Sequence, residues 1–135
     1  MRLPPTAGKL GLVLRCLVVD DNASFIEAAT TLLEREGLTV VGAASSIAEA
    51  LTRVQELRPD VVLVDIMLGL ESGFSLARQL GQADLGAQII LISTHAESDF
   101  AELIDQSPAV GFLSKSDLSA AAIRACARPS PPFPR

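Results

Sequence analysis

Polar side chains capable of chemistry follow four of the five short apolar runs in this 135-residue chain. Taken singly, each has an ordinary structural role: an aspartate after a strand often caps a helix, serine and threonine form turns, and a lysine is usually a solvated surface charge. Together they supply three carboxylates, hydroxyl groups and one ammonium group. These residues are Asp20, Asp21, Asp65, Ser93, Thr94, Ser114 and Lys115.

This set of groups is complete for reversible phosphoryl transfer to an aspartate. Three neighbouring carboxylates repel one another and raise at least one pKa unless a cation joins them. Mg²⁺ suits such a site because it prefers carboxylate, water and phosphate oxygens. A carboxylate beside the metal can attack a phosphoryl group and form an aspartyl phosphate. The metal and a lysine then offset the charge on the phosphoryl oxygens, to which a hydroxyl can donate a hydrogen bond.

The apolar runs are the elements that must position these groups. They are continuous rather than alternating, which predicts parallel strands covered by helices on both faces. The runs are Leu12–Val19, Leu38–Val41, Val61–Val64, Ile89–Ile92 and Val110–Leu113.

Helical patterns separate the runs. Asn22 is placed to cap a helix that has Phe25 on its inward face and ends at Gly37. Ser46 has the spacing of a capping box with Glu49, and Pro59 ends the helix behind it. Weaker helical patterns cover Gly73–Leu80, Ser98–Gln106 and Ser116–Ala127.

This alternation predicts an α/β fold with a doubly wound five-stranded parallel sheet. Because no glycine-rich dinucleotide fingerprint occurs, we expect a flavodoxin-like (βα)5 arrangement with strand order 2-1-3-4-5. Open sheets of this kind bind ligands at the carboxyl ends of their strands. The aspartates, the serines and the lysine should therefore meet at one edge of the sheet.

Length and charge limit the class of protein. We expect one folded domain over residues 15–127, a loose leader over 1–14 broken by Pro4, Pro5 and Gly8, and a proline-rich tail or truncated linker over 128–135. The formal net charge of −5 argues against binding of nucleic acid by this domain, and no run is long enough to cross a membrane. Cys16 and Cys126 are expected to be buried, reduced thiols of a cytoplasmic protein.

The motifs at the strand ends together resemble those of the response-regulator receiver family, over roughly Arg15 to Ala127. Leu17-Val18-Val19-Asp20-Asp21-Asn22 is similar to the motif of the family's first strand, and Asp65 follows Asp21 by 44 residues. Gly73 stands eight residues beyond Asp65, Ser93 stands 28 beyond it, and Lys115 follows Ser93 by 22. Gly111-Phe112-Leu113-Ser114-Lys115 resembles the family's fifth-strand signature.

The resemblance implies a role for each matching residue. Asp65 would be the phosphoacceptor, and Asp20, Asp21, Asp65 and the backbone carbonyl of Met67 would bind Mg²⁺. Lys115 would pair with the phosphoryl group.

Two further residues correspond to the family's switch. Ser93 would donate a hydrogen bond to the phosphoryl group, and Phe112 stands at the position of the aromatic that turns inward after phosphorylation. The alternative for Phe112 is a plain core residue on a buried strand.

Several positions depart from the family's usual pattern. Gly69 replaces a common proline in the acceptor loop, and Ser116 replaces a common proline after the lysine, where it can cap the last helix. Both are typical of receivers joined to helix-turn-helix output domains. Met67 and His95 flank the acceptor. An apolar Met67 should not position an attacking water, so we expect slow self-dephosphorylation, whereas His95 is expected to be a surface loop residue.

The resemblance also implies partners. A histidine kinase or phosphotransfer protein would donate the phosphoryl group, and phosphorylation would remodel the fourth helix, fifth strand and fifth helix for an output partner that the sequence does not name. We expect a stand-alone receiver or a receiver fragment of a DNA-binding response regulator, without membrane contact. A homodimer through Ala120-Ala121-Ala122 of the last helix remains open.

Two other classes of protein share parts of this pattern. A phosphorylation-independent pseudo-receiver, acting only as an interaction module, conflicts with the complete set of acids, hydroxyl and lysine. A phosphatase of the haloacid-dehalogenase type requires a second aspartate two residues beyond the nucleophile, where this chain has Met67. The expected protein is therefore a switch, not a conventional enzyme.

Overall fold

The computed structural model describes residues 14–127. The predicted tail and all but the last residue of the predicted leader lie outside these residues. None of the helices within 14–127 combines the length and apolar character that a membrane span requires.

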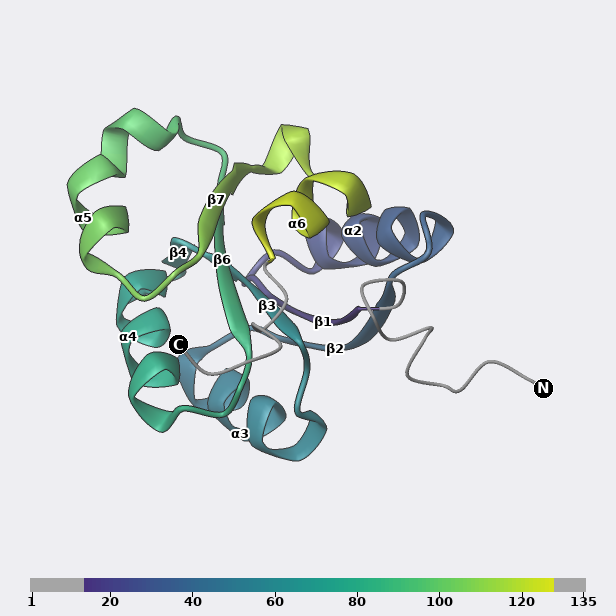
Figure 1. Ribbon diagram of the computed structural model, residues 1–135, viewed down its shortest axis with the longest axis horizontal. Helices are drawn as coiled ribbons and strands as arrows, with labels where there is room; N and C mark the ends of the chain where they lie inside the picture. Colours follow the sequence, from purple (N-terminus) through teal and green to yellow (C-terminus); the bar gives the residue numbers. More distant parts are fainter. Residues whose placement is uncertain (1–13, 128–135) are drawn as a thin grey trace, which may run out of the picture.

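Five parallel strands form the central sheet in the order β2-β1-β3-β6-β7. This is the predicted order 2-1-3-4-5 of a flavodoxin-like fold. Figure 1 shows the strands side by side between two layers of helices. The strands are β1 (Arg15–Val19), β2 (Thr39–Ala44), β3 (Val61–Asp65), β6 (Gln88–Ser93) and β7 (Gly111–Ser114).

Helices cover both faces of the sheet, as the continuous apolar runs predicted. Buried residues of α2 and α6 share one core cluster with one face, and those of α3 and α4, with the partly buried Ile104 of α5, share the other. The helices are α2 (Ala23–Arg35), α3 (Ile47–Leu57), α4 (Gly73–Ala83), α5 (Ala101–Gln106) and α6 (Ala120–Cys126).

Strand β1 shows why apolar and polar residues do not alternate along the apolar runs. Leu17 and Val19 belong to the cluster under α3 and α4, and Cys16 and Val18 belong to the cluster under α2 and α6. Successive side chains of a strand point to opposite faces, and here both faces are covered, so the four buried positions after Arg15 are all apolar.

Of the two predicted helix caps, the one at Asn22 forms as predicted and the one at Ser46 forms only in part. Asn22 Oδ1 accepts a hydrogen bond from the Phe25 N–H at 3.1 Å, as predicted. Ser46 Oγ accepts from the Glu49 N–H at 3.2 Å, but Glu49 Oε1 accepts from the Ser45 N–H at 2.8 Å rather than closing a reciprocal box with Ser46.

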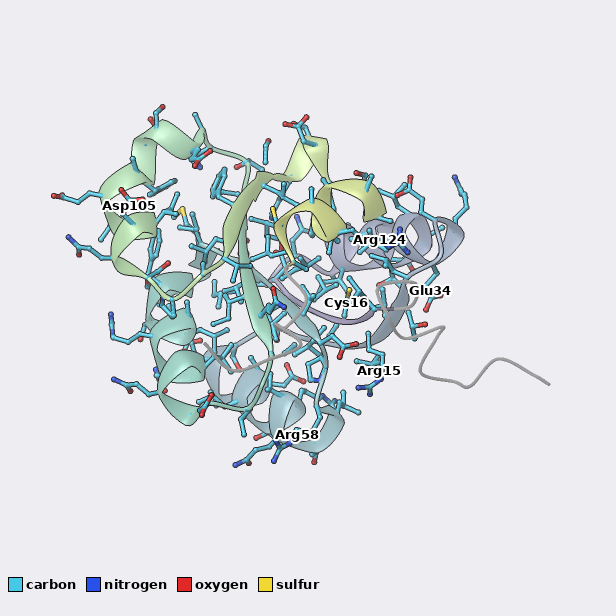
Figure 2. The ribbon with its side chains drawn as sticks, in the orientation of Figure 1. Arg15, Cys16, Glu34, Arg58, Asp105 and Arg124 are labelled. Carbon is cyan, nitrogen blue, oxygen red and sulfur yellow. The ribbon has the colours of Figure 1, made fainter. Side chains whose placement is uncertain are left out.

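Residues at the base of the sheet tie α3 to β1. Arg58 ends α3 in the left-handed conformation just before Pro59. The Arg15 guanidinium donates to the Arg58 carbonyl at 2.6 Å and to the Leu57 carbonyl at 2.7 Å. Figure 2 labels Arg15 and Arg58 at this end of the molecule. These bonds satisfy carbonyls that the end of a helix otherwise leaves without partners.

The helix predicted over Ser98–Gln106 is divided. A 3₁₀ turn, η1 (Glu97–Phe100), precedes the short α5. Its Phe100 packs against the core cluster and has its ring centroid 6.0 Å from that of Phe74 in α4.

The prediction that Ser116 caps the last helix is wrong. Ser116 lies within a 3₁₀ turn, η2 (Lys115–Asp117), and α6 begins only after Ser119, whose Oγ accepts from the Ala122 N–H at 3.0 Å. The physical reason is Leu118, which is buried with an extended backbone. The helix starts once this side chain has entered the core.

The two cysteines differ in burial. Cys16 lies in the core, where burial first and the charge of Asp60 second raise the pKa of its thiol to about 12. Cys126 is a half-buried thiol rather than a fully buried one. At this pKa Cys16 remains protonated, so it packs as a small apolar residue.

Candidate functional site

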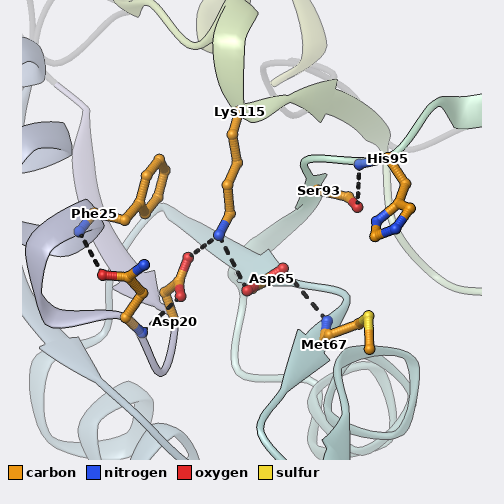
Figure 3. A network of polar contacts seen from close by, with 8 residues as sticks. Asp20, Phe25, Asp65, Met67, Ser93, His95 and Lys115 are labelled. Atoms are coloured by element: carbon orange, nitrogen blue, oxygen red, sulfur yellow. Dashed lines mark hydrogen bonds and ion pairs between the residues drawn. The ribbon is translucent and has the colours of Figure 1, made fainter.

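The predicted site residues meet at the carboxyl edge of the sheet. Asp20 directly follows β1, Asp65 is the last residue of β3, Ser93 is the last of β6, and Lys115 directly follows β7. Figure 3 shows their side chains converging above the strand ends. The parallel sheet therefore brings together residues that are up to 95 positions apart in the chain.

Lys115 connects the two buried acids of this site. Its Nζ lies 2.6 Å from Asp20 Oδ2 and 3.2 Å from Asp65 Oδ2. The Lys115 side chain is 14% exposed, that of Asp65 9% and that of Asp20 0%. Buried charges are tolerated where they are paired, so each of these groups depends on the others.

The protonation states follow from burial and from this pairing. Burial, and second the charge of Asp20, raise the pKa of Asp65, while Lys115 and the Met67 N–H act in the opposite direction. Burial alone would lower the pKa of Lys115, but its close ion pair with Asp20 and the charge of Asp65 outweigh this effect and raise the pKa. Lys115 is therefore a cation at neutral pH.

Asp20, Asp21 and Asp65 form a cluster that suits a divalent cation. One oxygen of each carboxylate lies within 4.8 Å of the others, and Asp21 is the solvent-exposed member of the cluster. Asp20 Oδ1 accepts from the Asn22 N–H at 2.9 Å, but Oδ2 is buried and accepts no hydrogen bond from residues 14–127. Its contact is the ion pair with Lys115.

The donors fit a hard cation in both chemistry and charge. When all are ionised, three carboxylates against one ammonium leave negative charge uncompensated. A buried carboxylate oxygen that shares one ammonium with a second acid gains from a metal ion, and carboxylate oxygens are the ligands that Mg²⁺ and Ca²⁺ prefer.

The acceptor loop is a short hairpin that the sequence did not reveal. Strands β4 (Met67–Leu68) and β5 (Glu71–Ser72) pair in antiparallel fashion. The Met67 N–H donates to Asp65 Oδ1 at 3.3 Å, and Met67 is 55% exposed. Glu71 Oε1 accepts from the Ile47 N–H at 2.9 Å, which anchors the hairpin to the start of α3.

Gly73 lies directly beneath the acceptor. A Cβ at this position would lie 2.1 Å from the Asp65 carbonyl oxygen, and the Gly73 N–H donates to the Ile66 carbonyl at 2.7 Å. No side chain fits there without displacing α4 or the end of β3. The sequence signal was its spacing from Asp65.

The remaining predicted residues lie around this centre. Ser93 is buried, and its Oγ accepts from the His95 N–H at 2.9 Å. His95 is exposed, as predicted, with its ring edge-on to Phe100. Phe112 is half-buried and packs against the core cluster under α3 and α4, a position that suits both roles considered for it.

Phe25 is a residue of this site that sequence reasoning assigned only to the core. Its ring centroid lies 4.4 Å from Lys115 Nζ. Helical periodicity placed Phe25 on the inward face of α2, but no local pattern indicates that its ring meets a lysine 90 residues later.

Comparison with known proteins decides the family. A family model described as the response regulator receiver domain matches residues 16–126. The chain belongs to the response-regulator receiver family. Receivers are signalling switches of two-component systems rather than conventional enzymes, and the acidic cluster with its lysine is the site this family shares.

Three relatives show how this receiver compares with its family. The chain is 42% identical over 86 residues to the DNA-binding response regulator MtrA of Mycolicibacterium paratuberculosis, covering 62% of this chain and 36% of MtrA. A LuxR-family two-component response regulator of an Aurantimonas species has a TM-score of 0.74 and 30% identity, covering 89% of this chain and 91% of that one.

The third is a response regulator of Burkholderia pseudomallei, solved with a phosphorylated aspartic acid, a calcium ion and citrate. It has a TM-score of 0.74 and 29% identity, covering 85% of this chain and 66% of that one. The receiver spans 50% of the length of a transcriptional regulator of Pseudomonas aeruginosa and 36% of MtrA, so it covers about half or less of these curated relatives.

Proposed function

We propose that this receiver is a Mg²⁺-dependent phosphoacceptor switch in which Asp65 accepts a phosphoryl group from a partner histidine kinase or phosphotransfer protein. The observation that carries the proposal is the pairing of one partly buried ammonium, that of Lys115, with both Asp20 and Asp65. This arrangement holds a cation where negative charge must accumulate during phosphoryl transfer.

The proposed reaction forms one bond to Asp65 and breaks one in the donor. An Asp65 carboxylate oxygen attacks phosphorus, and the bond from phosphorus to the donor's histidine nitrogen, or to the oxygen of a small acyl phosphate, breaks with its electron pair. Asp20, Asp21, Asp65 and the Met67 carbonyl would hold Mg²⁺. When bound, the metal offsets charge on the phosphoryl oxygens.

Lys115 and Ser93 have defined parts in this proposal. Formation of the aspartyl phosphate, a mixed anhydride, removes the Asp65 carboxylate charge, so the Lys115 ammonium turns from Asp65 Oδ2 to a phosphoryl oxygen. Ser93 Oγ already accepts from the His95 N–H, and its own hydroxyl hydrogen can be donated to another phosphoryl oxygen. Because the His95 N–H donates to Ser93 Oγ, turning the Ser93 hydroxyl toward the phosphoryl group would shift the backbone of the loop at His95.

Output would follow from a change in the face formed by α5, β7 and α6. Phe112 lies in β7, and Leu103 of α5 and Val110 before β7 are exposed apolar side chains on this part of the molecule. The named relative MtrA is a DNA-binding response regulator. This likeness supports transcription as the output, either by a stand-alone receiver acting through a partner or by a receiver that is part of a DNA-binding regulator.

The test is phosphoryl uptake from a small acyl phosphate with Mg²⁺, followed by intact mass and by lability of the adduct to hydroxylamine. The wild type should gain one phosphoryl group, and Asp65→Asn should gain none. Capture of binding partners with and without beryllofluoride and Mg²⁺ tests the output. A wild type that stays unmodified, with partners indifferent to beryllofluoride, would instead support the pseudo-receiver alternative.

A further inference from the structure

The Lys115 ammonium has a third neighbour besides its two carboxylates. The Phe25 ring centroid lies 4.4 Å from Nζ, which is within the range of a cation–π interaction. In the view of Figure 3 the ring lies on one side of the ammonium and Asp65 on the other. The lysine is thus enclosed by a carboxylate pair and an aromatic face.

The same turn of chain fixes both the ring and one of the carboxylates. The Asn22 N–H donates to Asp20 Oδ1 at 2.9 Å, and Asn22 Oδ1 accepts from the Phe25 N–H at 3.1 Å. The half-buried Phe25 also packs against the core cluster under α2 and α6. Its ring therefore has a fixed place relative to Asp20 before any phosphoryl group arrives.

We propose that Phe25 is a positioning residue for phosphoryl transfer, holding the Lys115 ammonium in place while it exchanges Asp65 for a phosphoryl oxygen. The inference rests on the proposed function of Asp65. An aromatic face attracts a cation without taking up any of its three N–H donors. The ammonium can therefore pivot from one oxygen to another and keep this contact throughout, whereas a hydrogen-bond acceptor at the same place would compete with the phosphoryl group.

The alternative is that Phe25 is only a packing residue of the core. Phe25→Leu separates the two roles because leucine keeps an apolar side chain but has no aromatic face. Phe25→Tyr is the conservative variant, since it keeps the ring and adds only a hydroxyl. If Phe25→Leu does not fold, Phe25→Met supplies a flexible apolar replacement.

A spectroscopic signature tests the contact in the full chain without any reaction. In wild type and Phe25→Tyr, the Lys115 ε-methylene protons should be shifted upfield by the ring current. In Phe25→Leu they should return to ordinary lysine values, while the thermal unfolding curve remains cooperative. Unshifted protons in the wild type would overturn the contact itself.

Reaction rates test the function of the contact. With a small acyl phosphate and Mg²⁺, Phe25→Leu should be phosphorylated about three- to tenfold more slowly, because an ammonium that is no longer held in place is aligned with the phosphoryl oxygens less often. Phe25→Tyr should restore the rate. In a Lys115→Met background the further loss caused by Phe25→Leu should vanish, because the two residues act as one pair.

The outcomes separate this role from the proposed function. Phe25 is only a core residue if the wild type accepts a phosphoryl group and Phe25→Leu does so equally fast. The same conclusion holds if Phe25→Leu slows phosphorylation by the same factor in the wild-type and in the Lys115→Met background. If the wild type accepts none, the proposed function fails and the role of Phe25 fails with it.

Discussion

At the scale of single residues, the site contains more acid than its one lysine can balance. Asp20 and Asp65 both form ion pairs with the Lys115 ammonium. Asp21 lies in the same cluster, but within residues 14–127 it forms no ion pair with Lys115. The folded domain therefore holds Asp65 at an energetic cost that a bound metal ion would relieve. Sites that carry out chemistry commonly retain such unfavourable charge.

A first prediction follows from the pKa of Asp65, which burial and then Asp20 raise above its ordinary value of 3.8. Between that value and the raised pKa, the folded state keeps a proton that the unfolded state has lost, so stability falls as pH rises. Asp65→Asn, which cannot ionise, should melt about 3–6 °C higher at pH 7 in EDTA, the shift expected for about 1 kcal/mol. The gain should disappear near pH 3.8.

Thermal unfolding at a series of pH values measures this effect. Asp105→Asn removes an exposed carboxylate from α5 and serves as the matched control, with no comparable gain. Destabilisation by Asp65→Asn at pH 7 would mean that the ion pair with Lys115 outweighs burial and the repulsion from Asp20.

A second prediction concerns the lifetime of the phosphoryl group. Met67 is largely exposed beside Asp65 and has no group that can orient a water molecule. Met67→Asn supplies such a group and should shorten the phosphoryl half-life about three- to tenfold, the scale of one added hydrogen bond in the transition state. Met67→Leu, the apolar control, should leave the half-life unchanged. The slow-dephosphorylation hypothesis is wrong if Met67→Asn behaves like Met67→Leu.

The residues of the site could be predicted where the backbone alone places them. Asp20, Asp65, Ser93 and Lys115 stand at strand ends, and a parallel sheet forces strand ends to meet. Phe25 could not be predicted in this role, because its contact with Lys115 joins two elements through side-chain directions that no local pattern encodes. The anchoring of Glu71 on the Ile47 N–H was hidden for the same reason.

At the scale of elements, the strands could be predicted better than the helix starts. A short, continuous apolar run between helical patterns is typical of a strand covered on both faces, and right-handed crossovers then limit the strand order. The start of α6 depends on where Leu118 enters the core, which is a tertiary event. The same holds for α5, where Phe100 packs into the core at the end of a 3₁₀ turn.

A third prediction belongs to the joint between β3 and α4. Gly73→Ala would place a Cβ 2.1 Å from the Asp65 carbonyl oxygen, so α4 must move or the end of β3 must shift. We expect a loss of about 1–3 kcal/mol in stability, as for other overpacked positions. Phosphoryl uptake should also slow because Asp65 itself is displaced.

Gly42→Ala is the matched control for this experiment. Its Cβ would meet the ends of two flexible leucine side chains, Leu57 at 3.0 Å and Leu17 at 3.4 Å, rather than backbone. Urea unfolding and phosphorylation rates of both variants measure the difference. Equal effects of the two substitutions would contradict a special role for the Gly73 contact.

At the scale of the whole molecule, the acidic site and the predicted dimer contact lie on different parts of the fold. The site lies at the carboxyl edge of the sheet, whereas the predicted dimer contact lies on α6. Within that contact Ala120 is buried in the core and Ala121 is exposed, so only part of the alanine stretch can meet a second copy. The homodimer stays a prediction that the mass in solution can test.

The last prediction links the site to the stability of the whole domain. A cation that binds the three aspartates only when the fold brings them together must stabilise that fold, by about 2.7 kcal/mol at a free concentration one hundred times its Kd. Mg²⁺ should therefore raise the melting temperature in a concentration-dependent manner, whereas NaCl of equal ionic strength should not. Asp20→Asn should abolish most of the rise because it removes a buried carboxylate, and its charge, from the three-aspartate cluster.

The pH dependence of this effect is opposite to that of the metal-free domain. Protons compete with the metal for Asp65, so stabilisation by Mg²⁺ should be lost as pH falls through the raised pKa of that carboxyl. In EDTA, by contrast, the Asp65 contribution to stability falls as pH rises. Two unfolding series over the same pH range, with and without Mg²⁺, should therefore diverge toward neutral pH and converge in acid. Parallel curves would show that the cation binds elsewhere than at the Asp20, Asp21 and Asp65 cluster.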